Sequence, residues 1–93
     1  MTIRVVYSRH AAAEVEEIFS VLLERSARAA QRFRERLSRG ERQLSLFPNS
    51  GPPGLTPGTR RLIVGDYIVS YRRQGEDVEI FAVRHARRRD ARF

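Results

Sequence analysis

An apolar stripe in the middle of the chain limits the possible folds most, because its residues recur at alternating steps of three and four. The stripe comprises Ala30, Phe33, Leu37, Gly40, Leu44 and Phe47. This spacing puts the six residues on one face of an α-helix, which we expect from Ala27 to about Leu46 with Ser26 as its cap. Gly40 costs about 1 kcal/mol in helix propensity, so we expect a close backbone approach there as compensation.

A second amphipathic pattern precedes this helix. It predicts a helix from His10 to about Arg25, with Ser8 in the capping position and glutamates on the solvent-facing sides. Its apolar face consists of Val15, Ile18, Phe19 and Leu22. Two such helices joined by a short link favour an antiparallel helical hairpin.

Four short runs rich in β-branched residues predict strands. They are residues 2–7, 59–64, 67–73 and 77–84. Gly65-Asp66 and Gln74-Gly75-Glu76 separate the last three, which therefore predict an antiparallel meander. In the middle strand, we expect Tyr67, Val69 and Tyr71 to share one face and Ile68, Ser70 and Arg72 the other.

The order of these elements predicts an α+β fold, β-α-α-β-β-β, in which an N-terminal helical hairpin packs on a small antiparallel sheet. The first strand is expected at one edge of the sheet. Pro48 ends the second helix, and residues 48–58 form an irregular surface loop that is either an inert connector or a partner-facing segment. Because 93 residues support one core, we expect a single domain over 1–93, ending in a basic tail.

The net charge of +7 comes entirely from arginine, which favours nucleic acid or an acidic protein segment as a partner. The absence of cysteine excludes disulfides and thiolate metal sites. His10 and His85 lie at opposite ends of the chain, so we predict no metal. The sequence has no glycine-rich phosphate loop, and we predict no cofactor. The apolar runs are too short for a signal peptide or a membrane span, and we therefore expect a cytoplasmic protein without membrane contact.

Metal-free RNA cleavage is the one enzymatic reaction that these residues suggest. It requires a base, an acid and a cation that stabilises the crowded phosphorane. Imidazole normally titrates near neutrality, and His85 lies beside the arginines of the second half. Tyr67 and Tyr71 are interpreted as packing residues, although either could stack on a base.

Three segments in the second half carry a family resemblance. They read LSLFPNSG from Leu44, GTRRLIVGDYIVSYRR from Gly58 and VEIFAVRHARRRD from Val78. Together with the early AAAEVEEI, they resemble the ParE/RelE superfamily, the toxins of bacterial type II toxin–antitoxin pairs. The resemblance covers nearly the whole chain and implies the β-α-α-β-β-β frame predicted above.

Two positions favour the ParE branch over the RelE branch. RelE-like members cut messenger RNA on the ribosome, and they commonly place an arginine where this chain has Ile68 and a tyrosine near the C-terminus, where it has Phe93. ParE-like members are known for inhibiting DNA gyrase without agreed hydrolytic residues. The resemblance thus implies a gyrase inhibitor whose target-binding residues we expect to be Arg60, Arg61, His85, Arg87 and Arg88.

Other interpretations stay open from the sequence. The main alternative is a ribosome-dependent mRNA endonuclease, with His85 as acid or base and Arg60 or Arg61 stabilising charge, so enzymatic activity is undecided. A silenced toxin or a plain nucleic-acid-binding domain is a further one. The resemblance also implies a cognate antitoxin with an acidic, partly disordered segment, through which any contact with DNA would be indirect.

Overall fold

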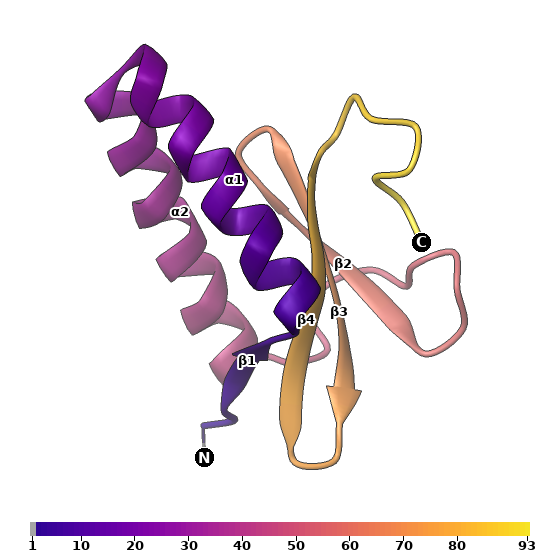
Figure 1. Ribbon diagram of the computed structural model, residues 1–93. Helices are drawn as coiled ribbons and strands as arrows, with labels where there is room; N and C mark the ends of the chain where they lie inside the picture. Colours follow the sequence, from indigo (N-terminus) through magenta and orange to yellow (C-terminus); the bar gives the residue numbers. More distant parts are fainter. Residues whose placement is uncertain (1) are drawn as a thin grey trace.

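The computed structural model describes residues 2–93 and has two layers, a helical hairpin against one face of a four-stranded sheet (Figure 1). The elements are β1 (Val5–Tyr7), α1 (Arg9–Arg25), α2 (Ala27–Leu46), β2 (Thr59–Val64), β3 (Tyr67–Gln74) and β4 (Asp77–His85). This order confirms the predicted α+β class and the β-α-α-β-β-β frame. The first strand is shorter than predicted, since residues 2–4 lie outside it.

Both helices begin at serine caps, as predicted. The Ser8 hydroxyl accepts a hydrogen bond from the Ala11 amide at 3.0 Å, and the Ser26 hydroxyl accepts one from the Ala29 amide at 3.2 Å. Ser26 alone separates the two helices, and its extended backbone (φ −165°, ψ 121°) reverses the chain. A one-residue link leaves the helices antiparallel and adjacent.

The sheet has the strand order β1-β4-β3-β2. β2, β3 and β4 form the expected antiparallel meander, and Gly65 (φ +60°) and Gly75 (φ +63°) supply the left-handed backbone of its two turns. β1 joins the β4 edge in parallel, with Val5 opposite Val78. The sheet is therefore mixed, and β1 lies at its edge as the sequence predicts.

The core lies between the hairpin and the sheet. Its buried residues include Phe33, Leu37 and Leu44 from α2, and Val69, Tyr71, Ile80 and Val83 from the sheet. A β-carbon at Gly40 would lie 3.2 Å from a Val64 methyl group and 3.3 Å from a Leu62 methyl group. Gly40 thus marks a close approach, and the groups that meet it are β2 side chains rather than backbone.

One member of the predicted apolar stripe was placed wrongly. Phe47 is 63% exposed, because α2 ends at Leu46 and Phe47 is its C-cap with φ −134° and ψ 73°. A residue that has left helical geometry no longer follows the 3.6-residue period. The helix therefore ends before Pro48 with Phe47 facing solvent.

The face of the sheet away from the helices is also buried in part. Ile68, Ser70 and Ala82 on this face are each at most 2% exposed. A β-bulge in β4 beside Ser70 and Tyr71 interrupts the strand register at Phe81, whose ring packs edge-on against Phe93 at 5.2 Å. The C-terminal residues, drawn in yellow in Figure 1, thus fold back beside the sheet rather than extending as a simple tail.

Candidate functional site

His85 ends β4 and lines a hollow between that strand and α1. It lies opposite Tyr67 in the sheet, and the two rings meet edge-on with centroids 5.4 Å apart. The hollow measures about 490 Å³, and its wall also includes Arg25, Glu17 and Arg88. The imidazole Nδ1 accepts a hydrogen bond from the Arg87 amide at 3.1 Å, which leaves Nε2 as the ring nitrogen available to a partner.

Arg84 joins this hollow to the tail, a role that sequence reasoning missed. Its guanidinium donates to the Glu14 carboxylate at 2.8 Å and to the Asp90 carbonyl at 2.8 Å, and it lies 4.8 Å from the Phe93 ring. The Glu14 carboxylate also accepts a hydrogen bond from the Val83 amide at 3.0 Å. Val83 lies beyond residues 78–80, the part of β4 that pairs with β1. The two contacts of Glu14 span about seventy residues, so no local pattern could have revealed them.

The tail arginines have different surroundings. Arg88 donates to the Asp90 carboxylate at 2.8 Å, and its side chain is about half exposed. Arg87 is exposed, and its backbone amide rather than its guanidinium holds His85. His85, Arg87 and Arg88 therefore form one group at the end of β4, as three of the predicted target-binding residues.

Arg60 and Arg61 on β2 hold the preceding loop. Arg60 donates to the Gly51 carbonyl at 2.7 Å, and Arg61 donates to the Pro53 carbonyl at 3.0 Å. In the register, Arg60 lies opposite Tyr71 and Arg61 opposite Ser70, so the two point to opposite faces of the sheet. The pair does not form a single cationic site.

The structure also separates this pair from His85. Arg61 and His85 are on strands two positions apart, and the register offsets them by three residues along β3. From strand spacing and rise, their α-carbons are about 14 Å apart, and those of Arg60 and His85 about 16 Å. The five predicted residues thus fall into two groups.

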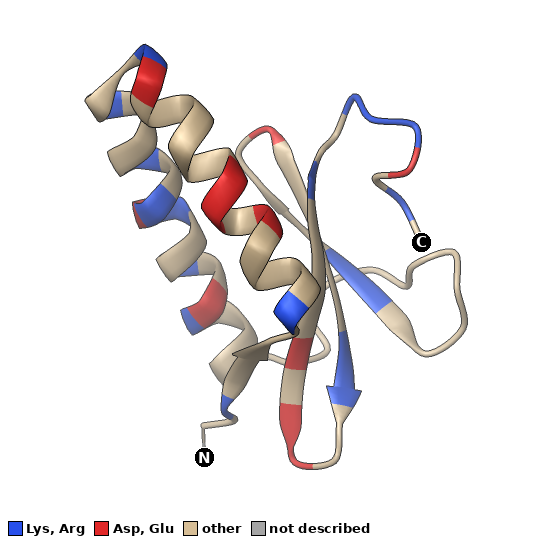
Figure 2. Ribbon diagram, viewed as in Figure 1, with Lys and Arg blue, Asp and Glu red and all other residues tan. Residues whose placement is uncertain are grey.

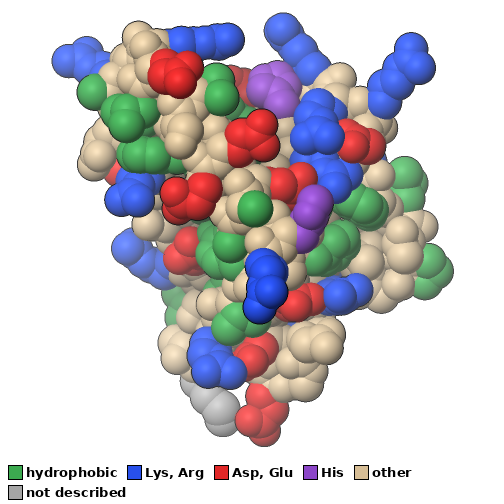
Figure 3. All heavy atoms as spheres, viewed as in Figure 1, with side chains coloured by type: hydrophobic (Ala, Val, Ile, Leu, Met, Phe, Trp, Pro, Cys, Tyr) green, Lys and Arg blue, Asp and Glu red, His purple; other side chains and the backbone are tan. Residues whose placement is uncertain are grey.

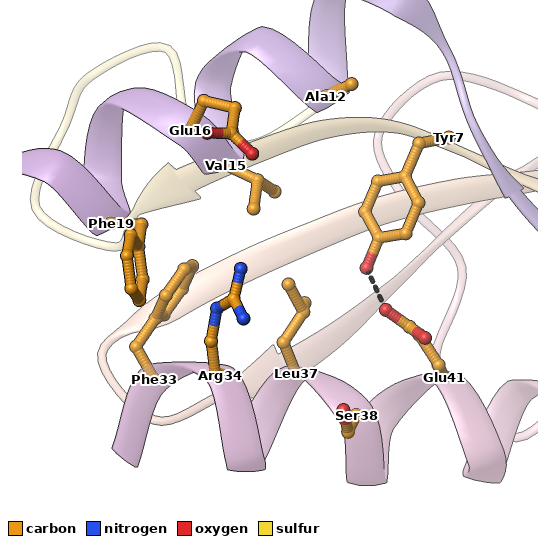
Figure 4. A pocket seen from close by; sticks show the side chains of 10 residues that line it. All are labelled: Tyr7, Ala12, Val15, Glu16, Phe19, Phe33, Arg34, Leu37, Ser38 and Glu41. Carbon is orange, nitrogen blue, oxygen red and sulfur yellow. Dashed lines mark hydrogen bonds between the residues drawn. The ribbon is translucent and has the colours of Figure 1, made fainter. Parts of the chain in front are cut away.

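A second candidate site is a groove between the helices, shown in Figure 4. It has a volume of about 340 Å³, and α1 and α2 form its two walls. The guanidinium of Arg34 lies 4.6 Å from the Phe19 ring and so covers part of the apolar surface. The groove is lined by Tyr7, Ala12, Val15, Glu16, Phe19, Phe33, Arg34, Leu37, Ser38 and Glu41.

Tyr7 marks the end of this groove nearest β1. Its hydroxyl donates to the Glu41 carboxylate at 2.6 Å, the contact dashed in Figure 4. Burial raises the pKa of the Tyr7 hydroxyl, and the bond to Glu41 raises it further. The groove therefore has a polar, ordered end and an apolar middle.

Charge is divided unevenly between the helices. α1 carries two arginines and four glutamates, a net −2, whereas α2 carries six arginines and two glutamates, a net +4. Figure 2 shows this contrast along the two helices. On the face in Figure 3, acidic side chains lie over α1, and basic ones gather near the C-terminal end of β4.

Residues 2–93 contain no helix of the length and apolarity that crossing a membrane requires. In the same part of the chain, the histidine, aspartate and glutamate side chains do not gather in threes around a possible metal position.

Comparisons with known proteins agree with this geometry. Residues 5–90 match the protein family described as the ParE toxin of type II toxin-antitoxin system, parDE. A candidate toxin of Sinorhizobium fredii (strain NBRC 101917 / NGR234), named Y4kP, is 34% identical over 85 residues, which cover 89% of this chain and 88% of that protein. A chain of the solved chromosomal ParDE TA system from P. aeruginosa has the same fold, with a TM-score of 0.70 and 19% identity over 90% of this chain and 96% of that one.

The family match and the related toxin thus define the class of this chain as a small toxin of a type II toxin–antitoxin system. The chain belongs to the ParE toxin family, the toxins of type II toxin–antitoxin systems.

Proposed function

We propose that this toxin arrests growth by binding DNA gyrase and blocking replication, and that it contacts gyrase through His85, Arg87 and Arg88. The observation that carries the proposal is the separation of these residues from Arg60 and Arg61, whose guanidinium groups are already engaged by loop carbonyls. The group at the end of β4 is partly exposed and combines an imidazole with cations, which suits a carboxylate-bearing protein surface.

RNA cleavage is the less favoured mode of action. A general base must reach the proton that it abstracts within about 3 Å, and a charge-stabilising cation must contact the same reacting group. Arg61 lies opposite Ser70 and His85 lies opposite Tyr67, so their side chains project from opposite faces of the sheet and do not meet at one phosphate without rearrangement. Arg60 shares the face of His85, but its guanidinium is held by the Gly51 carbonyl. Ile68 is fully buried, and the Phe93 ring packs against Phe81, so neither supplies the missing chemistry.

A gyrase supercoiling assay with purified components tests this proposal. The double variant Arg87→Gln/Arg88→Gln should need at least about tenfold more protein to inhibit, since a lost charge-assisted hydrogen bond costs about 1.5–3 kcal/mol. The matched control, Arg9→Gln/Arg73→Gln, removes the same charge at exposed positions elsewhere and should stay near the wild type. A wild-type chain that arrests growth but leaves gyrase fully active would contradict the proposal.

We further propose that the groove between the helices receives a segment of the cognate antitoxin. Its middle offers Val15, Phe19 and Leu37 to apolar side chains, while Arg34 at the wall favours a carboxylate. An acidic, partly disordered segment that folds on binding meets both requirements and complements the net charge of +7.

Two neighbouring residues of α1 provide a matched test. Ala12 lines the groove and Ala13 does not, although both are exposed. Ala12→Arg should fill the groove and abolish neutralisation in cells that express both toxin and antitoxin, whereas Ala13→Arg should stay neutralised. Equal neutralisation of the two variants would place the antitoxin elsewhere.

A further inference from the structure

The outward face of α2 carries a continuous stripe of arginines opposite the buried stripe. Its members are all exposed and follow one another at steps of three or four residues: Arg28, Arg32, Arg36, Arg39 and Arg42. The stripe is about 21 Å long and covers about a third of the helix circumference. In Figure 2, basic segments run along most of α2, on the outer side of the molecule.

These five guanidinium groups are not neutralised by the protein itself. Within residues 2–93, none of them forms an ion pair or a side-chain hydrogen bond, whereas Arg4, Arg72, Arg84 and Arg88 each contact a carboxylate. Glu35, the one acidic residue on this face of α2, accepts a hydrogen bond from Gln31 at 3.3 Å. The unpaired positive charge of α2 is thus available to a partner.

The chemistry of the remaining exposed residues indicates which partner. Between Arg28 and Arg42, the other exposed residues of α2 are Gln31, Arg34, Glu35 and Ser38, all of them polar. A protein interface normally needs an apolar, desolvated centre, and this face has none. Interfaces with nucleic acids are polar and strongly positive, so the face fits phosphates better than an acidic protein segment.

The shape of the face favours a double helix over a single strand. It has no aromatic side chain on which an unpaired base could stack. Its arginines spread to both sides of the helix axis, so a helix lying in a groove could reach both walls. The major groove of B-form DNA admits an α-helix, whereas that of A-form RNA is too narrow.

We propose that the outer face of α2 binds the phosphate backbone of duplex DNA through these five arginines, independently of base sequence. This is a second binding activity, separate from the group at the end of β4. It gives the toxin a direct contact with DNA, whereas the resemblance implied only an indirect one through the antitoxin. The proposal does not depend on gyrase as the target.

The test is the salt dependence of binding to a short mixed-sequence DNA duplex, measured by fluorescence anisotropy without gyrase. Each phosphate contact contributes about −0.9 to the slope of log K against log salt concentration, so the wild type should give a slope of about −4 to −5. The triple variant Arg32→Gln/Arg36→Gln/Arg39→Gln should reduce that slope by about three and weaken binding more than about a hundredfold at 0.1 M salt.

A second triple variant controls for net charge. Arg73→Gln/Arg89→Gln/Arg92→Gln removes the same three charges from exposed positions of the sheet and tail, outside the group at the end of β4, and should change the slope by less than about one. Thermal unfolding of both variants should match the wild type, because exposed substitutions change stability by about 0.5 kcal/mol or less.

Three results would overturn the proposal. One is an equal loss of DNA binding in both triple variants. Another is binding to duplex RNA as tight as to duplex DNA. The last is an α2 triple variant that binds DNA like the wild type but loses its antitoxin, because that face would then be a protein interface.

Discussion

At the scale of single residues, Gly51 holds the loop before β2 against the core. Its amide donates a hydrogen bond to the Tyr71 hydroxyl at 3.0 Å, and its carbonyl accepts one from the Arg60 guanidinium at 2.7 Å. A β-carbon at this position would overlap the Arg61 carbonyl oxygen and the Tyr71 hydroxyl. The backbone can pass so close to β2 and β3 only because residue 51 has no side chain.

We therefore predict that Gly51→Ala lowers the free energy of unfolding by about 2 kcal/mol or more, as overpacking against fixed atoms does. Urea unfolding followed by circular dichroism measures the loss. Asn49→Ala, two residues earlier at an exposed position, should cost no more than about 0.5 kcal/mol. Equal stability of the two variants would contradict the close packing of Gly51 against β2 and β3.

Tyr7 predicts a pH dependence of stability. Burial and the bond to Glu41 raise its pKa in the folded state above the value of about 10 in an unfolded chain. The folded state therefore favours the neutral phenol, and this contribution is complete below about pH 10 and is lost as the pH rises further. Urea unfolding between pH 8 and 11 should show a falling free energy of unfolding.

The variant Tyr7→Phe separates this effect from general alkaline denaturation. Because phenylalanine does not ionise, the variant should be less stable at pH 8 but should lose less stability at higher pH. Some pH dependence of the variant's stability should remain, since burial also raises the pKa of Tyr67. Parallel pH profiles for variant and wild type would mean that Tyr7 does not carry the effect.

At the scale of elements, Glu14 connects α1 to β4 and, through Arg84, to the tail. Glu14→Ala removes the partner of the Val83 amide and of the Arg84 guanidinium, both of them largely shielded from solvent. We expect the free energy of unfolding to fall by about 2 kcal/mol. The loss should not be larger, because Arg84 keeps its contact with Asp90.

Hydrogen exchange locates that effect. In Glu14→Ala, the amides of residues 86–93 should exchange faster, whereas Glu17→Ala, at an exposed position one turn away, should leave them unchanged. Uniformly faster exchange over the whole chain would indicate global destabilisation rather than release of the tail.

The elements themselves were mostly predictable, because their causes are local. Periodicity placed both helices, Ser8 and Ser26 capped them, and the glycines of the two turns separated the strands. Phe47 was misplaced because a periodic pattern does not reveal where the helix geometry stops. The parallel pairing of β1 with β4 joins segments about seventy residues apart, which no local pattern encodes.

At the scale of the whole molecule, the candidate sites were predictable only in part. The sequence predicted His85, Arg87 and Arg88 as candidate residues, and they lie together at the end of β4. It did not indicate that Arg60 and Arg61 point to opposite faces of the sheet and bind loop carbonyls. The tail was expected to be merely basic, yet Ala91 is 1% exposed and Phe93 packs on Phe81. The division of charge between α1 and α2 was present in the sequence, but the net charge of the whole chain does not reveal it.

The most direct test of the proposed function is induced expression in a bacterium that lacks the antitoxin, with pulse labelling of DNA and protein synthesis. We predict that DNA synthesis falls first and that the DNA-damage response follows while translation initially continues. If protein synthesis fell first and transcripts were cut, the gyrase proposal would be contradicted, and the hollow around His85 would have to be an RNA-cleaving site.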